Sequence, residues 1–172
     1  MDTEELLDMA GMVMHRSEAG MAYADRHDVR AAPTLTVKSD DVAAAIVDRL
    51  EPRIRGKVIV DVGGGTGLLG MHLARVAQKV FVIEANPILT MAWVDLHHRI
   101  KPKNLSYLFG SASEFVGTVK ADVALVLTHS GLTSMMAVAR QLAVEAIDVY
   151  GEMVDENPAA FDEWAREARK RT

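Results

Sequence analysis

The segment Asp61-Val62-Gly63-Gly64-Gly65-Thr66-Gly67 is the part of this chain whose residue types and spacing best suit chemistry at a ligand. Glycines that follow a buried strand let the backbone turn sharply and approach a bound molecule, and the helix after them presents free N–H groups. A second acidic residue, Glu84, is expected at the end of the next strand. A carboxylate there can accept hydrogen bonds from both hydroxyl groups of a ribose, so the pattern predicts a site for a nucleoside-containing ligand.

Strands and helices alternate regularly around this segment. The run from Lys57 to Val62 indicates a strand buried on both faces, because it is rich in β-branched residues and is bounded by glycines. This spacing fits parallel strands with right-handed crossovers, so we expect an α/β fold with a doubly wound, mostly parallel Rossmann-like sheet of about four or five strands. The other expected elements are strands at Val80 to Ile83, Leu105 to Phe109 and Ala121 to Leu127, and helices at Leu68 to Val76, from Asn86-Pro87 toward Arg99, and at Ala112 to Val116.

Helices are expected at both ends of the chain. Apolar residues recur at helical spacing from Leu6 to Met14, and Ser39 is the expected N-cap of a helix that Pro52 ends. The stretch from Leu132 to Met153 also has helical spacing, so we expect no fifth strand there, although Ala143 to Tyr150 can be read either way. The predicted organisation is a single domain over residues 1–172, with an N-terminal helical extension over 1–38 and C-terminal helices over 132–172, the last of which begins at Pro158.

The composition indicates one domain and excludes several kinds of chemistry. With 172 residues the chain can bury a core, and the absence of cysteine excludes disulfides and thiolate chemistry. A net charge of −5 argues against a general electrostatic attraction to nucleic acid. No apolar run approaches the roughly 20 residues that span a bilayer, and the acidic start differs from a signal peptide. We therefore expect a cytoplasmic protein.

The Asp-x-Gly-x-Gly-x-Gly pattern that begins at Asp61 resembles the first motif of the Rossmann-like, class I S-adenosylmethionine (SAM)-dependent methyltransferases. Glu84 is similar to the acidic residue that these enzymes place at the end of the second strand. The resemblance covers roughly Val42 to Leu127 and implies SAM as the cofactor, with Asp61 near the amino group of SAM through the glycine backbone or water. The cofactor-binding residues that it implies are Asp61, Gly63, Gly64, Gly65, Thr66, Gly67, Glu84, Ala85, Ser111 and Ala112.

The turns after the third and fourth strands depart from the family pattern. Family members often carry an acidic residue after the third strand for the adenine amino group, whereas this chain offers the hydroxyl of Ser111 and the N–H of Ala112. After the fourth strand, Thr128-His129-Ser130-Gly131 stands where members that methylate nucleic acid amino groups have Asn or Asp, two prolines and an aromatic residue. That mode of amino methylation is therefore disfavoured. His129 is the candidate catalytic residue, as a general base for a hydroxyl acceptor.

The family sheet normally continues past the fourth strand, so the chain resembles a methyltransferase that is truncated there. A parallel strand at an open sheet edge would expose unpaired N–H and C=O groups. We therefore expect that the C-terminal helices or a homodimer partner cover the edge of the fourth strand and complete the acceptor pocket.

Three functions stay open. The favoured one is a methyltransferase whose acceptor is a small molecule, a protein or an RNA. The alternative is a catalytically silent SAM-binding module or subunit. The pattern Gly65-x-Gly67-x-x-Gly70 also fits an NAD(P) site, but it begins too far beyond the strand end. No metal site is expected, since the adjacent His97 and His98 point about 100° apart on a helix and are interpreted as surface residues.

Overall fold

The computed structural model describes residues 40–127 and 132–154. The helices expected at Leu6 to Met14 and after Pro158, the N-cap Ser39 and the candidate base His129 lie outside these residues. The described elements are α3 (Asp40–Ile54), β1 (Val58–Val62), α4 (Leu68–Leu73), β2 (Lys79–Glu84), α5 (Pro87–Leu96), β3 (Leu105–Phe109), the 3-10 helix η1 (Ala112–Phe115), β4 (Ala121–Val126), α6 (Leu132–Leu142), β5 (Ala143–Asp148) and α7 (Val149–Val154).

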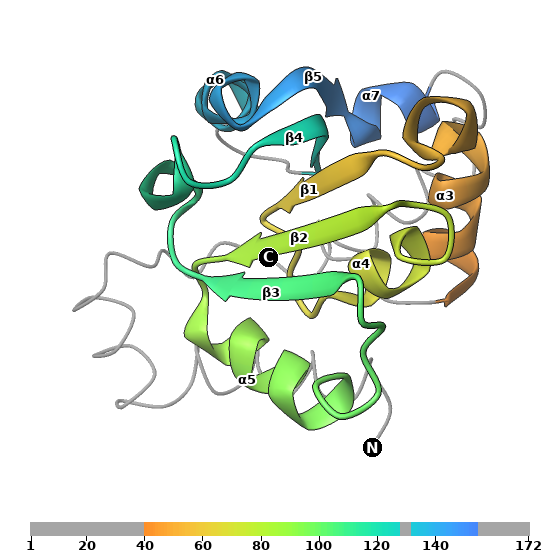
Figure 1. Cartoon of the computed structure of the whole chain (residues 1–172), viewed down its shortest axis with the longest axis vertical. Helices are drawn as coiled ribbons and strands as arrows, with labels where there is room; N and C mark the ends of the chain where they lie inside the picture. Colours follow the sequence, from red (N-terminus) through yellow and green to blue (C-terminus); the bar gives the residue numbers. More distant parts are fainter. Residues whose placement is uncertain (1–39, 128–131, 155–172) are drawn as a thin grey trace.

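The described strands form one parallel sheet in the order β3-β2-β1-β4-β5 (Figure 1). The four strands expected from sequence are all present, each within one residue of its expected ends. The chain moves outward from β1 to β3 and then returns to β4 on the other side of β1. This confirms the predicted α/β, doubly wound, Rossmann-like sheet, and it places a topological switch point at the carboxyl ends of β1 and β4.

Helices cover both faces of the sheet. On one face, α3, α4 and Trp93 of α5 pack against residues such as Ile59 and Val82, and on the other face α6 packs against residues such as Val60. In Figure 1, α5 is drawn below β3 and α6 above β4. Because alternate residues of a strand face the same side, Asp61 lies on the face of Ile59, which α4 covers. None of the helices in the described ranges is long and apolar enough to cross a membrane.

The expectation that no fifth strand follows α6 was wrong, because β5 pairs in parallel with β4. Its apolar residues also satisfy strand alternation, since Ile147 is 2% exposed and Val144 is 92% exposed. Pairing with β4 satisfies backbone groups that an open edge would leave without partners, and this tertiary contact decides between strand and helix. β5 therefore covers the edge that we expected the C-terminal helices or a homodimer partner to cover.

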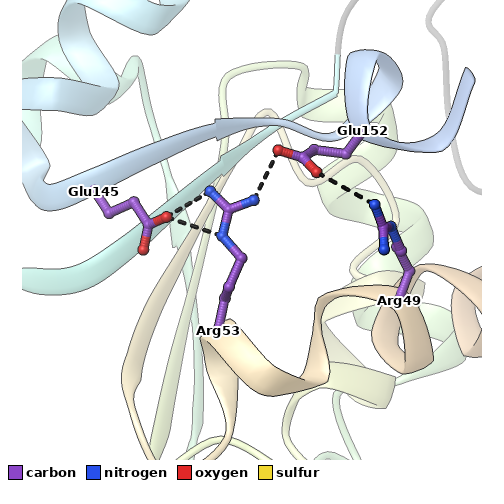
Figure 2. A network of polar contacts seen from close by, with 4 residues as sticks. All are labelled: Arg49, Arg53, Glu145 and Glu152. Atoms are coloured by element: carbon purple, nitrogen blue, oxygen red, sulfur yellow. Dashed lines mark hydrogen bonds and ion pairs between the residues drawn. The ribbon is translucent and has the colours of Figure 1, made fainter. Parts of the chain in front are cut away.

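An ion-pair network joins α3 to the elements that follow β4 (Figure 2). The guanidinium of Arg53 donates to Glu145 of β5 and to Glu152 of α7, with Nε–Oε1 and Nη1–Oε1 distances of 2.9 and 2.7 Å. Arg49 lies 4.0 Å from the second carboxylate oxygen of Glu152. Because these side chains are about one third exposed, the network contributes modestly to the packing of α3 on β5 and α7.

Two expected helix ends were wrong. Pro52 lies inside α3, because Ile54 two residues later is fully buried and its burial offsets the hydrogen bond that proline cannot donate. α4 ends at Leu73 instead of Val76. There the side-chain amide of Asn104 donates to the carbonyls of Ala74 and Ala77, which satisfies groups that a longer helix would have used.

The prediction that His97 and His98 are both surface residues was right for His98 only. His98 is exposed as expected, but His97 is buried and packs against Trp93, with ring centroids 5.7 Å apart. Burial lowers the pKa of His97, since the charged ring is costly to remove from water. His97 is therefore a neutral core residue.

Candidate functional site

The glycine loop, residues 63–67, joins β1 to α4 at the switch point of the sheet. The N–H groups of Gly63 and Gly64 both donate to the carbonyl of Ile83, at 2.8 and 3.1 Å, so the loop is attached to β2. Three of its glycines have positive φ angles, which other residues adopt only with strain: +76° at Gly63, +60° at Gly65 and +78° at Gly67. The loop therefore turns sharply and depends on glycine at alternate positions.

Two glycines let the loop and α4 lie directly on β2. A β-carbon on Gly64 would lie 2.4 Å from Cγ1 of Val82 and 2.8 Å from Oδ2 of Asp61. A β-carbon on Gly70 would lie 2.4 Å from Cγ2 of Val82. Close helix–sheet packing is also the role of the third glycine in dinucleotide-binding fingerprints, so the geometry of Gly70 leaves the NAD(P) interpretation open.

Glu84, the last residue of β2, points its carboxylate at the glycine loop. Oε2 accepts a hydrogen bond from the N–H of Gly65 at 2.9 Å, and Oε1 accepts one from the N–H of Asn86 at 2.6 Å. The residue is 8% exposed, and burial raises the pKa of its carboxyl while the backbone N–H groups partly oppose that rise. No ion pair to Glu84 is present among the described residues. Among the described residues, backbone donors hold the carboxylate at the loop.

Asp61 is a second buried carboxyl on the same face of the sheet. It is 2% exposed, and its Oδ2 has no hydrogen-bond partner within the described part of the chain. Burial, together with the charge of Glu84, raises the pKa of Asp61 to about 7. The hydroxyl of Thr66 in the loop is also buried and lacks a partner among those residues. Two carboxyls and a hydroxyl at one loop are suited to a ligand that brings positive charge and hydrogen-bond donors.

Ser111 and Ala112, the residues expected to contact an adenine ring, follow β3. Ser111 is the N-cap of η1 and forms a capping box with Glu114, and its hydroxyl lies 2.9 Å from that of Ser113. The preceding Gly110 donates its N–H to the backbone carbonyl of Glu84 at 2.9 Å. Ser111 and Ala112 therefore follow directly on a turn that is bonded to the end of β2. Ala85, also expected at the site, is exposed beside Glu84.

Sequence reasoning missed two aromatic residues that contact the loop. The hydroxyl of Tyr107 on β3 donates to the carbonyl of Gly65 at 2.6 Å, and its ring stacks on Trp93 of α5 with centroids 4.7 Å apart. The alternation of side chains along β3 could have placed Tyr107 in the sequence analysis, because it puts Tyr107 on the same face as Leu105 and so toward α4 and α5. No sequence pattern between Gly65 and Tyr107 predicts the hydrogen bond that joins them.

The candidate base and the expected absence of a metal both stay predictions. His129 lies outside the described residues, so its catalytic role stays a prediction. Within residues 40–127 and 132–154, no group of three or more His, Asp or Glu side chains is arranged to hold a metal ion.

The sequence matches no protein-family model, and no curated protein matches it. Solved structures do resemble it in fold. A protein from Pyrococcus horikoshii proposed to be an RNA methyltransferase has a TM-score of 0.52 and 16% identity over 69% of this chain. The precorrin-6y C5,15-methyltransferase of Geobacter metallireducens has a TM-score of 0.54 and 16% identity over 62%, and the precorrin 8w decarboxylase of Methanobacterium thermoautotrophicum has 0.52 and 24% over 62%.

These similarities define the class of fold. The chain has the α/β fold of the Rossmann-like, class I SAM-dependent methyltransferases, over about 60% of its length. It spans 66%, 58% and 59% of the three structures, in the order given above. At these identities the similarity concerns the fold, and activity has to be argued from the site.

Proposed function

We propose that this chain binds SAM at the glycine loop, between Asp61 and Glu84. The observation that carries the proposal is the meeting of two buried carboxyls with a loop of positive-φ glycines at the switch point of the sheet. Burial raises the pKa of both carboxyls, so ionising both is costly unless the ligand compensates. SAM carries an ammonium group, a sulfonium centre and two ribose hydroxyls, which together offer that compensation.

Each residue has a specific role in this proposal. A carboxylate has about four lone-pair sites, and the bonds from Gly65 and Asn86 leave Glu84 able to accept from the ribose hydroxyls. Oδ2 of Asp61, which has no hydrogen-bond partner among the described residues, is available to the ammonium group, directly or through water. The Ser111 hydroxyl and the Ala112 N–H follow the turn bonded to β2 and would meet the adenine edge. When bound, SAM supplies an electrophilic methyl group.

A methyltransferase with an acceptor still to be identified is the function that we favour. Methyl transfer requires mainly that an acceptor nucleophile be aligned with the methyl group. His129, which follows β4, is our candidate for proton removal from a hydroxyl acceptor. A catalytically silent SAM-binding module is the second candidate. It needs only the binding residues Asp61 and Glu84 and no site for an acceptor.

Binding is tested by calorimetry with SAM, S-adenosylhomocysteine and NAD on the wild type and on Glu84→Gln. The variant keeps the shape of the side chain but loses its charge, so we expect at least about tenfold weaker binding of both adenosyl ligands. Glu51→Gln is the matched control, because Glu51 forms a surface pair with Arg55 on α3. Tighter binding of NAD than of SAM would contradict the proposal.

Activity is tested with methyl-labelled SAM and a fractionated cell extract. Label that enters the small-molecule, protein or RNA fraction with wild type but not with Glu84→Gln supports a methyltransferase and gives the acceptor class. Binding of SAM without transfer to any fraction supports the silent module. A loss of transfer in His129→Ala, with unchanged affinity for S-adenosylhomocysteine, would support a catalytic role for His129.

A further inference from the structure

The peptide groups around Gly65 are held from two neighbouring strands. The N–H of Gly65 donates to Oε2 of Glu84 at the end of β2, and its carbonyl accepts from the hydroxyl of Tyr107 in the middle of β3. The N···O and O···O distances are 2.9 and 2.6 Å. Gly65 has a φ of +60°, so these two bonds hold the loop residue in a conformation that its own backbone favours little over others.

Tyr107 is itself fixed by packing. Its ring stacks on Trp93 with an interplanar angle of 12°, and Trp93 is 3% exposed. A β-carbon on Gly67, the next glycine of the loop, would lie 2.5 Å from Trp93 and 3.4 Å from Tyr107. The stacked pair of Trp93 and Tyr107 therefore packs directly against the glycine loop. Burial raises the pKa of Tyr107 above its ordinary value of 10.0 and outweighs a hydrogen bond with the Thr90 side chain, so the hydroxyl stays a neutral donor at all physiological pH values.

The bond between Tyr107 and Gly65 affects the orientation of the Glu84 carboxylate. Glu84 reaches the loop through the N–H of Gly65, and the orientation of that N–H follows from the conformation of the glycine. If the carbonyl of Gly65 lost its donor, the residue would sample other φ and ψ values, and Glu84 would lose one of its backbone donors. A carboxylate with fewer donors is less well oriented toward a second set of hydroxyl groups.

We infer that Tyr107 is a positioning residue of the ligand site: its hydroxyl sets the Gly65 peptide, and through it the carboxylate of Glu84, for an adenosyl ligand. The inference rests on the proposed function for the nature of the ligand. It assigns no chemical step to Tyr107, which acts from beneath the loop. Its substitution therefore weakens binding through the loop and leaves the rest of the fold in place.

Tyr107→Phe tests this inference, because it removes one oxygen and retains the ring that stacks on Trp93. We expect the Kd for S-adenosylhomocysteine to rise about five- to tenfold, in keeping with the loss of the buried hydrogen bond to Gly65, and the variant also removes the contact of the hydroxyl with the Thr90 side chain. Hydrogen exchange at the Gly65 amide, measured by NMR without ligand, should become faster by a similar factor, while amides of β1 and β4 keep their rates. Tyr150→Phe on α7, which packs against the same core cluster, is the control and should change neither quantity.

The outcomes separate the inference from the proposed function. Unchanged exchange at Gly65 in Tyr107→Phe overturns the inference whether or not a ligand binds. If the wild type binds S-adenosylhomocysteine and Tyr107→Phe binds it equally well, the inference is overturned and the proposed function stays intact. A wild type that binds neither SAM nor S-adenosylhomocysteine overturns the proposed function, and faster exchange at Gly65 then still shows that Tyr107 holds the loop. Faster exchange at β1 and β4 as well would mean a general loss of stability and overturn the specific role.

Discussion

Gly67 lies against the indole of Trp93, so closely that a β-carbon at this position would be 2.5 Å from Cε3 of the ring. The glycine loop is thus packed between β2, through Gly64 and Val82, and α5, through Gly67 and Trp93. Neither Gly64 nor Gly67 leaves room for a β-carbon, so the loop packs closely on both sides.

Gly67→Ala should be much more destabilising than Gly56→Ala. Both glycines have positive φ angles, +78° and +69°, so both substitutions carry backbone strain of about 1–2 kcal/mol. A β-carbon at Gly56 meets nothing within 4 Å, whereas at Gly67 it overlaps Trp93 and adds an overpacking cost of about 1–3 kcal/mol. Urea unfolding measures the difference. Equal losses in the two variants would show that the loop does not rest on α5.

Asp61→Asn should change how stability depends on pH. The folded-state pKa of Asp61 is about 7 and its ordinary value is 3.8, so the stability linked to this carboxyl is full below pH 4 and is lost as pH rises toward 7. Relative to Asp61→Asn, the wild type should therefore lose roughly 2–3 kcal/mol between pH 5 and pH 8. Denaturant titrations of both proteins at several pH values test this. Parallel pH profiles would mean that Asp61 ionises normally in the folded protein.

Ile147→Ala and Val144→Ala test whether the segment after α6 is a strand. In β5, Ile147 is buried and Val144 is exposed, so we expect a loss of about 2–4 kcal/mol for the first and less than about 0.5 kcal/mol for the second. Thermal or urea unfolding provides the measurement. Similar losses for the two substitutions would contradict the pairing of β5 with β4.

Arg53→Met should weaken the attachment of α3 to β5 and α7 by about 1 kcal/mol, because the pairs with Glu145 and Glu152 are partly exposed (Figure 2). Most of this difference should disappear in 1 M salt, which screens exposed charges. Arg55→Met is the control, since Arg55 is more exposed and pairs only with Glu51 among the described residues. A loss that is insensitive to salt would show that Arg53 acts through the packing of its stem.

Local sequence patterns were sufficient where the elements are buried on both faces or are followed by glycine. β1, β2 and β4 could be predicted because their β-branched residues and the turns that bound them differ clearly from helix, and β3 because it takes the next place in the alternation of strands and helices. Asp61 and Glu84 could be placed at one site because parallel strands end at the same sheet edge. The sequence alone therefore determined the α/β class, the glycine loop and the two carboxyls beside it.

Only the tertiary structure decided which partners these residues meet. The alanines and glutamate of β5 suit a helix as well as a strand, and the unpaired edge of β4 settles the choice. The contact from Tyr107 to Gly65 joins residues 42 positions apart, and the burial of His97 depends on Trp93. Such contacts arise from packing between elements, and packing is a property of the assembled layers that no local spacing of residue types encodes.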